Sequence, residues 1–473
     1  MRVAVLGAGP CGITAGLKLA EAGIETLILD RLPFAGGASA SRPIGDGKSR
    51  MDFGPHVFHV KNPEVNKLFF DYAGSDCRIK KRNERILVCG GLFNYPLDIM
   101  EVLKQLTPGY IFWMGTAFAI ARVRRKIFPM KEDNFESWGI SHFGKPLYEF
   151  TCGKYTEKVW GMRPCYLSEK LAQQKLKDLR LRDIASKFFG NRSQELKQYW
   201  QDYAYPEDGI GIIFERMASA ISSRNGRVEL GAKLAGIESN GRKVTAINYK
   251  NFEGKETHWE CDALVNTIPL THLANALLEG SSSIKLNSAK NLKYRGLALI
   301  NAFFDMNQVM PYDWVYLLDE IFQCNRVTEQ KNMGSSMIAF GKTVLCFELA
   351  ATPGDAFWSA PDDVLAKIVK SDMDKIDFID SSKCKEFYVT RLDEAYPVYT
   401  LDFNKHIEET IKELASSENI FSSGRQGLFL NNDIHDSMEM GINTARHIID
   451  KLGTAEWYNF AWNYIIGKIE KKK

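Results

Sequence analysis

The sequence has no strong excess of charge of either sign. Its 61 lysine and arginine residues nearly balance 58 aspartate and glutamate residues, which leaves a net charge of +3 over 473 residues. A nucleic-acid-binding protein typically carries a pronounced basic excess, so the composition does not favour that class. A chain of this length is sufficient for two domains with large cores.

Paired cysteines at metal-binding or redox spacing are also missing. The nine cysteines are an odd number and no two form a Cys-x-x-Cys motif, which favours reduced thiols and a cytoplasmic location. The chain starts with a strand-like segment, so we expect no secretion signal. The Gly-x-Ser-x-Gly, P-loop and His-Glu-x-x-His motifs are absent, which argues against hydrolase and kinase functions.

No apolar run in the sequence approaches the roughly 20 residues needed to cross a membrane. One apolar segment, residues 110–121, is followed at once by four basic residues. We expect it to be a buried helix of a second domain. The alternative is a weak membrane-surface contact through residues 110–126, with aromatic residues at the interface and cations at lipid headgroups, in a protein peripheral to a membrane.

The N-terminal residues have the spacing of a dinucleotide-binding unit. An apolar strand, residues 3–6, leads into Gly7, Gly9 and Gly12, and a helix is predicted over residues 13–22. In such a unit Gly7 permits a tight turn and Gly9 lets the backbone approach a pyrophosphate. Gly12 lets the helix pack closely against its strand. The helix N-terminus adds free amides and a partial positive charge.

A second strand, residues 26–29, ends at Asp30, where an acidic side chain would hold a ribose hydroxyl. An acid at this position argues against a 2′-phosphate. Asp30 and Arg31 are followed by the glycine pair Gly36 and Gly37. This continuation resembles FAD-binding flavoproteins, and it implies one non-covalently bound FAD whose phosphates and ribose lie near these residues.

Patterns farther along predict an α/β protein whose dinucleotide-binding unit is interrupted by insertions. After residue 96, amphipathic stretches predict helices up to about residue 200. Strand-like runs from residue 227 to 261, separated by turn signals, predict a β-meander that ends in an apolar strand at 263–267. A last helix is predicted over about residues 436–452.

Five motifs occur in an order that indicates a family. They are the segments Asp52–His59, Phe93–Leu97 and Tyr155–Gly161 and the pairs Tyr396–Pro397 and Gly424–Arg425. Together they resemble the superfamily of flavin amine oxidases, protoporphyrinogen oxidases and UDP-galactopyranose mutases, and the mutases are the most similar in these motifs.

The resemblance implies a Rossmann-like FAD-binding domain assembled from discontinuous segments, with an inserted α+β substrate domain. The FAD-binding domain would comprise residues 1–95, 203–285 and 390–455. The substrate domain would comprise residues 96–202 and 286–389, and residues 456–473 would form a C-terminal helix and basic tail. Val228 is implied at the adenine, and Gly424 and Met438 are implied near the flavin.

Three residues are candidates for the reaction centre: His56, His59 and Arg425. The resemblance places the histidine segment against the flavin, although structural histidines are an alternative. A metal pair is disfavoured because positions i and i+3 of an extended segment face opposite sides, and no metal site is expected. Arg425 is a candidate for contact with the flavin or a substrate phosphate, and the alternative is an exposed, solvated charge.

Candidate substrate residues are Tyr155, Trp160, Lys175 and Tyr396, as the resemblance implies; helical aromatic residues are otherwise more often part of a core. Two departures from the mutases stand out. The mutases have Arg where this chain has Lys175, and these residues are not interchangeable in a bidentate phosphate contact. The tyrosines that follow Gly-Arg in the mutases are missing from residues 426–433.

The implied function is that of an FAD-dependent enzyme acting on a nucleotide sugar or a lipid-linked sugar. In the mutase reaction, N5 of reduced flavin attacks the anomeric carbon, and NAD(P)H is a candidate external reductant. The alternative is an oxidoreductase whose oxidised flavin takes hydride from a C–H bond of an amine, porphyrinogen, polyene or sugar. A protein that binds FAD without turnover is disfavoured by the polar residues of the motifs.

Overall fold

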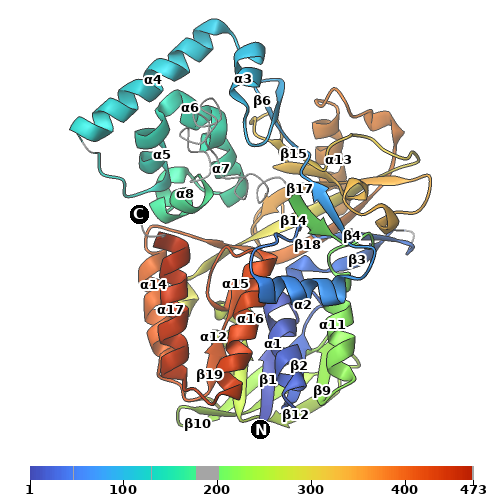
Figure 1. Cartoon of the computed structure of the whole chain (residues 1–473), viewed down its shortest axis with the longest axis vertical. Coiled ribbons are helices and arrows are strands. Elements are labelled where there is room, and N and C mark those ends of the chain that lie inside the picture. Colours follow the sequence, from blue (N-terminus) through green and yellow to red (C-terminus); the bar gives the residue numbers. More distant parts are fainter. Residues whose placement is uncertain (46, 129, 177–201, 471–473) are drawn as a thin grey trace.

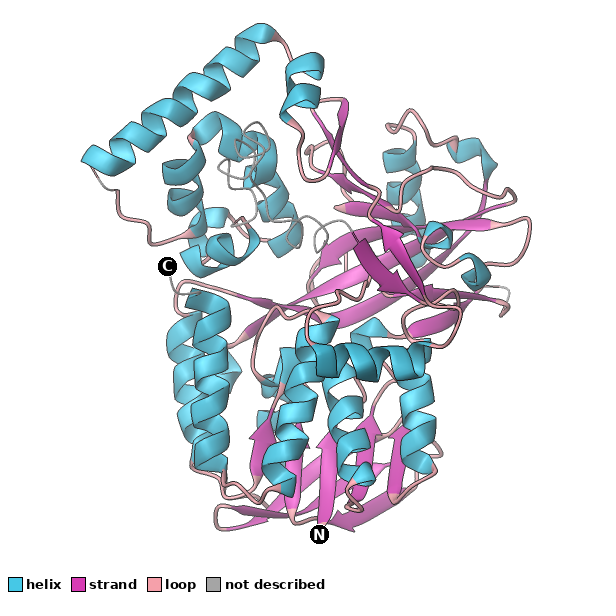
Figure 2. Ribbon diagram, in the orientation of Figure 1, coloured by secondary structure: helices cyan, strands magenta, loops and turns pink. Residues whose placement is uncertain are grey.

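The computed structural model describes residues 1–45, 47–128, 130–176 and 202–470. Its two parts are built on separate sheets (Figures 1 and 2). The basic tail Lys471–Lys473 and residues 177–201 of the expected substrate domain lie outside the described residues.

The lower part in Figure 1 contains a parallel five-stranded sheet. Its order is β19 (Ile420–Ser422), β13 (Ala263–Asn266), β1 (Arg2–Leu6), β2 (Glu25–Asp30) and β9 (Gly226–Leu230). On one face, α1 (Pro10–Glu21) lies between α11 (Ile212–Ser222) and α16 (Ile434–Ile449). The central strands are apolar and buried, as expected for a parallel sheet covered on both faces.

An antiparallel meander accompanies this sheet. It consists of β10 (Lys233–Asn240), β11 (Lys243–Lys250) and β12 (Glu256–Glu260), and α12 (Leu270–Glu279) packs on β10. The expectation that residues 227–230 and 263–267 belong to the meander is wrong, since these segments form β9 and β13 of the parallel sheet. All four residues of β13 are buried, which requires cover on both faces rather than an outer position in a meander.

The C-terminal helices complete the lower part. Helix α17 (Thr454–Glu470) packs against α14 (Phe403–Ala415) and the edge strand β19. The buried Trp457 indole donates a hydrogen bond of 3.0 Å to the carbonyl of Ser422. The predicted C-terminal helix is therefore integrated into the core next to the parallel sheet.

The upper part is built on a mixed seven-stranded sheet. Its order is β18 (Cys384–Val398), β14 (Lys293–Phe304), β17 (Thr343–Ala351), β16 (Arg326–Glu329), β15 (Trp314–Leu317), β6 (Glu84–Val88) and β7 (Gly91–Asn94). All neighbours are antiparallel except β15 and β6. Helix α13 (Asp362–Met373) packs on β14 and β18. Strands β6 and β7, expected within the first segment of the FAD-binding domain, thus extend the upper sheet.

Two further strand pairs and helix α2 (Pro63–Ala73) belong to neither of the two large sheets. Strand β3 (Ser41–Ile44) pairs with β4 (Ser49–Asp52), and β5 (Arg78–Lys81) pairs with β8 (Asp202–Tyr205). The Asp52 carboxyl group accepts hydrogen bonds from the hydroxyls of Ser41 and Tyr205. The first bond closes the β3–β4 hairpin, and the second fastens the hairpin to β8.

A group of helices attaches to the far end of the upper sheet. It comprises α3 (Ile99–Gln105), α4 (Pro108–Ile127), α5 (Phe135–Phe143), α6 (Lys145–Tyr148), α7 (Lys154–Trp160) and α8 (Glu169–Lys175). The expectation of a buried helix at residues 110–121 is wrong, because Met114 is the only fully buried residue of α4. Among the described residues, no helix is both long and apolar enough to span a membrane.

Candidate functional site

A cavity of about 520 Å³ opens where the carboxyl ends of β1 and β2 meet the upper part. Ligands of open α/β sheets bind at this edge. The predicted site residues that line the cavity are Gly7, Gly9, Asp30, Arg31, Gly37, His56, His59 and Arg425. The predicted residues outside its lining are Gly12, Gly36, Val228, Gly424 and Met438 and the four substrate candidates Tyr155, Trp160, Lys175 and Tyr396.

Two glycine loops meet at the middle of the cavity. Gly9 is the N-cap of α1, and the first residues of this helix, Pro10 and Cys11, line the cavity. The Gly36 amide donates a 2.8 Å hydrogen bond to the carbonyl of Ala8. A Cβ atom on Gly37, which has φ of +53°, would lie 3.1 Å from the Cα of Gly9. The backbone is therefore bare on both loops, which suits a pyrophosphate.

The next glycine of the motif serves packing rather than lining. A Cβ atom on Gly12 would overlap the carbonyl oxygen of Gly7, so α1 lies directly against the turn that follows β1. A Cβ atom on Gly9 would meet no protein atom within 4 Å. Gly12 is therefore needed for the packing of α1, whereas the space beside Gly9 is open to a ligand.

Asp30 ends β2 with its carboxylate turned back toward the first loop. It accepts hydrogen bonds from the amides of Ala8, at 2.7 Å, and Leu32, at 2.8 Å. Burial raises the pKa of Asp30, and these bonds partly offset the increase. Each oxygen keeps a lone pair for a further hydrogen bond, so the residue remains suitable for a ribose hydroxyl.

The Arg31 guanidinium forms two ion pairs with the upper sheet. It is held at 3.0 Å by Asp393 and at 3.0 Å by Glu394, both on β18. The ion pairs join the end of β2 to the upper sheet across the cavity wall. Arg31 thus bridges the two parts of the protein while it lines the cavity.

The end of the cavity beyond Asp30 is formed by the turn into the meander. Val228 lies inside β9, paired with Ile28, and does not line the cavity. The lining is provided instead by Ala232, Lys233 and Leu234. The structure therefore does not bring Val228, the residue implied at the adenine, to the lining of the cavity.

At the opposite end, α16 directs its N-terminus at the cavity. Asp433 is its N-cap, and Asn432, Asp433 and Ser437 line the space. The amide nitrogen and oxygen of Asn432 and the Nε of Arg425 are buried without a hydrogen-bond partner among the described residues. Orphaned polar atoms of this kind fit a polar ligand such as the ring edge of a flavin.

His56 lies beside this end in its neutral form. Its Nε2 is 3.1 Å from the carbonyl oxygen of Phe53. Burial, together with the nearby cations Arg425 and Arg326, lowers its pKa from 6.5 to about 4. At neutral pH the imidazole therefore forms hydrogen bonds without adding positive charge.

His59 is also buried, and Arg82 lies against its ring. The Arg82 Nη2 is 2.7 Å from the His59 Nε2, and Arg82 pairs with Glu84 on β6 at 3.1 Å. Burial and the Arg82 charge lower the pKa of His59. The two predicted histidines thus both line the cavity, but His56 is held by the carbonyl of Phe53 and His59 by Arg82.

The motif at residues 155–161 is explained by three contacts of α7. The Lys158 ammonium donates to the carbonyls of Leu317 and Asp319, both at 2.8 Å, which fixes the helix to the end of β15. Gly161, with φ of +66°, leaves room for the Arg295 guanidinium, which would lie 2.6 Å from an added Cβ. These contacts hold Tyr155 next to Tyr316 and Trp160 next to Tyr396. We call this group, together with Arg326, Glu348 and Arg425, the wall above the cavity; among its members only Arg425 is part of the cavity lining.

Charged and aromatic side chains form a cluster on this wall. Arg326 on β16 makes two 2.8 Å bonds to the carboxylate of Glu348 on β17. The Arg326 guanidinium lies 5.6 Å from the Tyr316 ring, and that ring contacts Tyr155 edge-on at 6.3 Å. Burial raises the pKa of Tyr155, so its phenol stays neutral.

The same wall continues to Arg425. The Tyr396 ring lies 5.9 Å from that of Trp160 and 5.2 Å from the Arg425 guanidinium. The structure thus brings Tyr155, Trp160, Tyr396 and Arg425 onto one wall. Lys175 is exposed at the end of α8 and does not line the cavity.

Sequence analysis missed Arg326, Glu348 and Tyr316. A signal for the first two was present, because Glu348 is a lone acid inside the apolar run Thr343–Ala351 and is fully buried. A buried carboxylate requires a partner of opposite charge. Tyr316 carried no comparable signal in the sequence.

Comparison with known proteins identifies the family of this chain. The family described as "Flavin containing amine oxidoreductase" matches residues 10–449. The chain belongs to this family. The family resemblance of the motifs is thereby confirmed.

Two curated mutases are similar in sequence to this chain over part of their length. A probable UDP-galactopyranose mutase of Klebsiella pneumoniae is 27% identical over 178 residues, 36% of this chain and 44% of that protein. A dTDP-fucopyranose mutase of Escherichia coli is 24% identical over 245 residues, 49% of this chain and 57% of that protein. The chain thus spans about half the length of these curated relatives.

Solved structures share the fold at low identity. A reduced UDP-galactopyranose mutase has a TM-score of 0.76 at 18% identity and covers 95% of this chain and 94% of its own. A putrescine oxidase bound to putrescine has a TM-score of 0.65 at 12% identity and covers 95% and 99%. These similarities confirm the mixed α/β fold.

The two glycines of the first loop give a matched pair of variants. We expect Gly9→Ala to keep the apoprotein as stable as wild type but to lower its FAD content, because the methyl group enters the cavity. Gly12→Ala is expected to lower the free energy of unfolding by about 1–3 kcal/mol, because helix and turn must separate. Urea unfolding and flavin absorbance of purified protein measure both; equal effects of the two variants would contradict the assignment.

The neutral state of His56 predicts a pH dependence. Unfolded histidine takes up a proton near pH 6.5, whereas His56 in the folded chain does so near pH 4. Its contribution to stability is thus present above pH 6.5 and is lost as the pH falls toward 4, by about 2 kcal/mol at pH 5. We expect His56→Gln to reduce the loss of unfolding free energy between pH 7.5 and 5 by that amount. His258→Gln, in the exposed meander, is the control, and identical profiles for both variants would refute the prediction.

Proposed function

We propose that this FAD-dependent enzyme acts on a nucleotide-linked or phosphate-linked sugar, in a reaction like that of the mutases it resembles. The observation that carries the proposal is the wall above the cavity, where two arginines stand among aromatic rings. Guanidinium groups bind phosphate oxygens in a fixed geometry, and aromatic faces stack with a base or a sugar. The proposed substrate lies between this wall and the cavity end lined by His56 and His59.

Arg425 is the proposed phosphate ligand. It lines the cavity, and its Nε has no partner in the described part of the chain. Its Nη1 donates a 3.1 Å bond to the carbonyl of Asn432, and the Tyr396 ring supports the guanidinium. Because the side chain is held in this way before binding, it loses little conformational entropy when it contacts a phosphate.

The other wall residues would position the sugar and exclude water. Trp160 packs edge-on against Tyr396 and keeps that ring in place. The neutral histidines offer hydrogen bonds without competing with arginine for the phosphate charge. Bound FAD supplies an electron-rich nucleophile when reduced and a hydride acceptor when oxidised. In the proposed mutase-like reaction NAD(P)H would serve as the external reductant.

A hydride-transferring oxidoreductase is the second candidate function. The ion pair between Arg326 and Glu348 favours it, because a guanidinium that is already neutralised has less charge to offer to a diphosphate. The absence of tyrosines from residues 426–433 points the same way. The family description, an amine oxidoreductase, is compatible with this candidate.

An anaerobic titration distinguishes the two reactions. We expect the oxidised enzyme to keep its flavin absorption near roughly 450 nm when UDP-galactopyranose is added without oxygen. After reduction by dithionite, the enzyme should convert the sugar nucleotide without consuming a stoichiometric oxidant. Bleaching of the oxidised flavin by an amine, a polyene or a free sugar would instead support the oxidoreductase.

Calorimetric binding tests the proposed phosphate contact. We expect Arg425→Ala to weaken binding of UDP roughly tenfold to a hundredfold, which corresponds to the loss of a charge-assisted bond of about 1.5–3 kcal/mol, with FAD content retained. Arg425→Lys should recover part of the loss. Lys175→Ala measures the sequence-based assignment on the same scale: a loss equal to that of Arg425→Ala would place the phosphate near α8. Unchanged binding in all three variants would exclude a diphosphate.

A further inference from the structure

Helix α4 presents an apolar stripe to solvent. Phe112, Ile120, Val123 and Ile127 recur at spacings of eight, three and four residues, which places them on one face of the helix. With Trp113 beside them, these side chains are 54–73% exposed. In Figure 1 the helix forms an outer edge of the molecule, at the end opposite to the N-terminus. Large apolar side chains gathered in this way indicate a contact surface.

Basic residues border the stripe on both sides. At 100° per residue, Arg122 and Lys126 lie along one edge of the stripe and Arg124 along the other. Helix α4 contains no acidic residue. Neither Arg124 nor Lys126 forms an ion pair with any described residue, and Arg122 lies over the Phe118 ring at 5.5 Å. The surface is therefore apolar at its centre and cationic at its margins.

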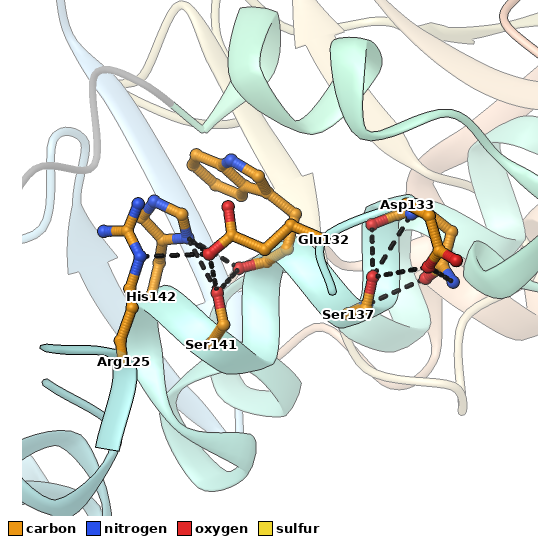
Figure 3. Close-up of polar contacts among 8 residues, drawn as sticks. Arg125, Glu132, Asp133, Ser137, Ser141 and His142 are labelled. Atoms are coloured by element: carbon orange, nitrogen blue, oxygen red, sulfur yellow. Dashed lines mark hydrogen bonds and ion pairs between the residues drawn. The ribbon is translucent and has the colours of Figure 1, made fainter. Parts of the chain in front are cut away.

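A hydrogen-bond network fixes the orientation of this surface (Figure 3). The Glu132 carboxylate accepts bonds from Arg125 Nε, at 3.0 Å, and from Ser141 Oγ on α5, at 2.5 Å. The same oxygen lies 3.7 Å from His142 Nδ1. Arg125 thus joins α4, through Glu132, to Ser141 of α5.

Close packing supports the same orientation. Gly144, between α5 and α6, has φ of +73°, and a Cβ atom there would lie 2.7 Å from the carbonyl oxygen of Ala117. Between α4 and these helices lies a hollow of about 320 Å³, lined by Trp113, Ile120 and Met130 among apolar residues and by Arg124 and Lys145 among cations. The hollow has the same mixed chemistry as the stripe beside it.

We propose that α4 docks the enzyme on an anionic lipid membrane, with the helix lying in the plane of the interface. The apolar stripe would enter the boundary between headgroups and acyl chains, and the flanking cations would bind lipid phosphates. Charge decides against a second copy of the chain as the occupant. Two α4 helices packed together would bring six cations, Arg122, Arg124 and Lys126 of each copy, into one interface without a single acid from either helix, which is unfavourable.

Vesicle flotation tests the proposal with the intact holoenzyme. We expect binding to vesicles that contain phosphatidylglycerol but not to pure phosphatidylcholine, and a decrease in binding at high salt because exposed charges are screened. The triple variant Phe112→Ser, Ile120→Ser, Ile127→Ser should bind at least tenfold more weakly. Arg124→Gln with Lys126→Gln should bind about 25-fold more weakly, from roughly fivefold per cation.

A matched control replaces exposed aromatic residues elsewhere. Phe252 and Phe340 are 78% and 98% exposed, and Phe252→Ser with Phe340→Ser should leave vesicle binding unchanged. Thermal unfolding should be the same for all variants, since the altered side chains are exposed. Absence of binding to anionic vesicles would overturn the proposal. So would light scattering that shows a wild-type dimer converted to monomers by the triple serine variant.

Discussion

The contact between two glycine loops determines where the rest of the site can lie. The loop after β1 and the loop after β2 approach so closely that a Cβ atom on Gly37 would lie 3.1 Å from the Cα of Gly9. From Gly37 the chain runs into the β3–β4 hairpin, and Ser41 Oγ accepts a 2.8 Å bond from the Gly211 amide. This anchored hairpin delivers the segment with His56 and His59 to one end of the cavity. The contact between the glycine loops thus sets the position of the exposed backbone in the middle of the cavity and of the two histidines at its end.

Local signals in the sequence predicted the elements around this contact well. The strand, turn and helix of the first loop depend on residues within one stretch of about thirty positions, so their glycines and the terminal Asp30 identify them. Pairing between strands that are far apart in the sequence has no comparable local signal. Strands β6 and β7 join a sheet whose other members lie more than 200 residues away, and Val228 enters the parallel sheet because β9 pairs with β2.

The surroundings of a segment or side chain also depend on residues that are distant in the sequence. An apolar run such as residues 110–121 is compatible with burial or with exposure to lipid, and only the neighbours of α4 decide between them. The same limit applies to Arg31, which lines the cavity and forms ion pairs with two acids of β18 that the sequence did not indicate. On the wall above the cavity, pairing between Arg326 and Glu348 likewise decides how much positive charge a substrate meets.

The strand order of the parallel sheet has a consequence for biosynthesis. Strand β1 lies at the centre of this sheet, yet its neighbour β13 is made about 260 residues later and the edge strand β19 more than 400 residues later. During translation β1 and β2 must therefore wait with one side of β1 unpaired, a state in which strands associate with other chains. Completion of the sheet is therefore a late event, and β19 is afterwards bonded by Trp457 of α17. We expect the nascent chain to depend on chaperones until the last helix has left the ribosome.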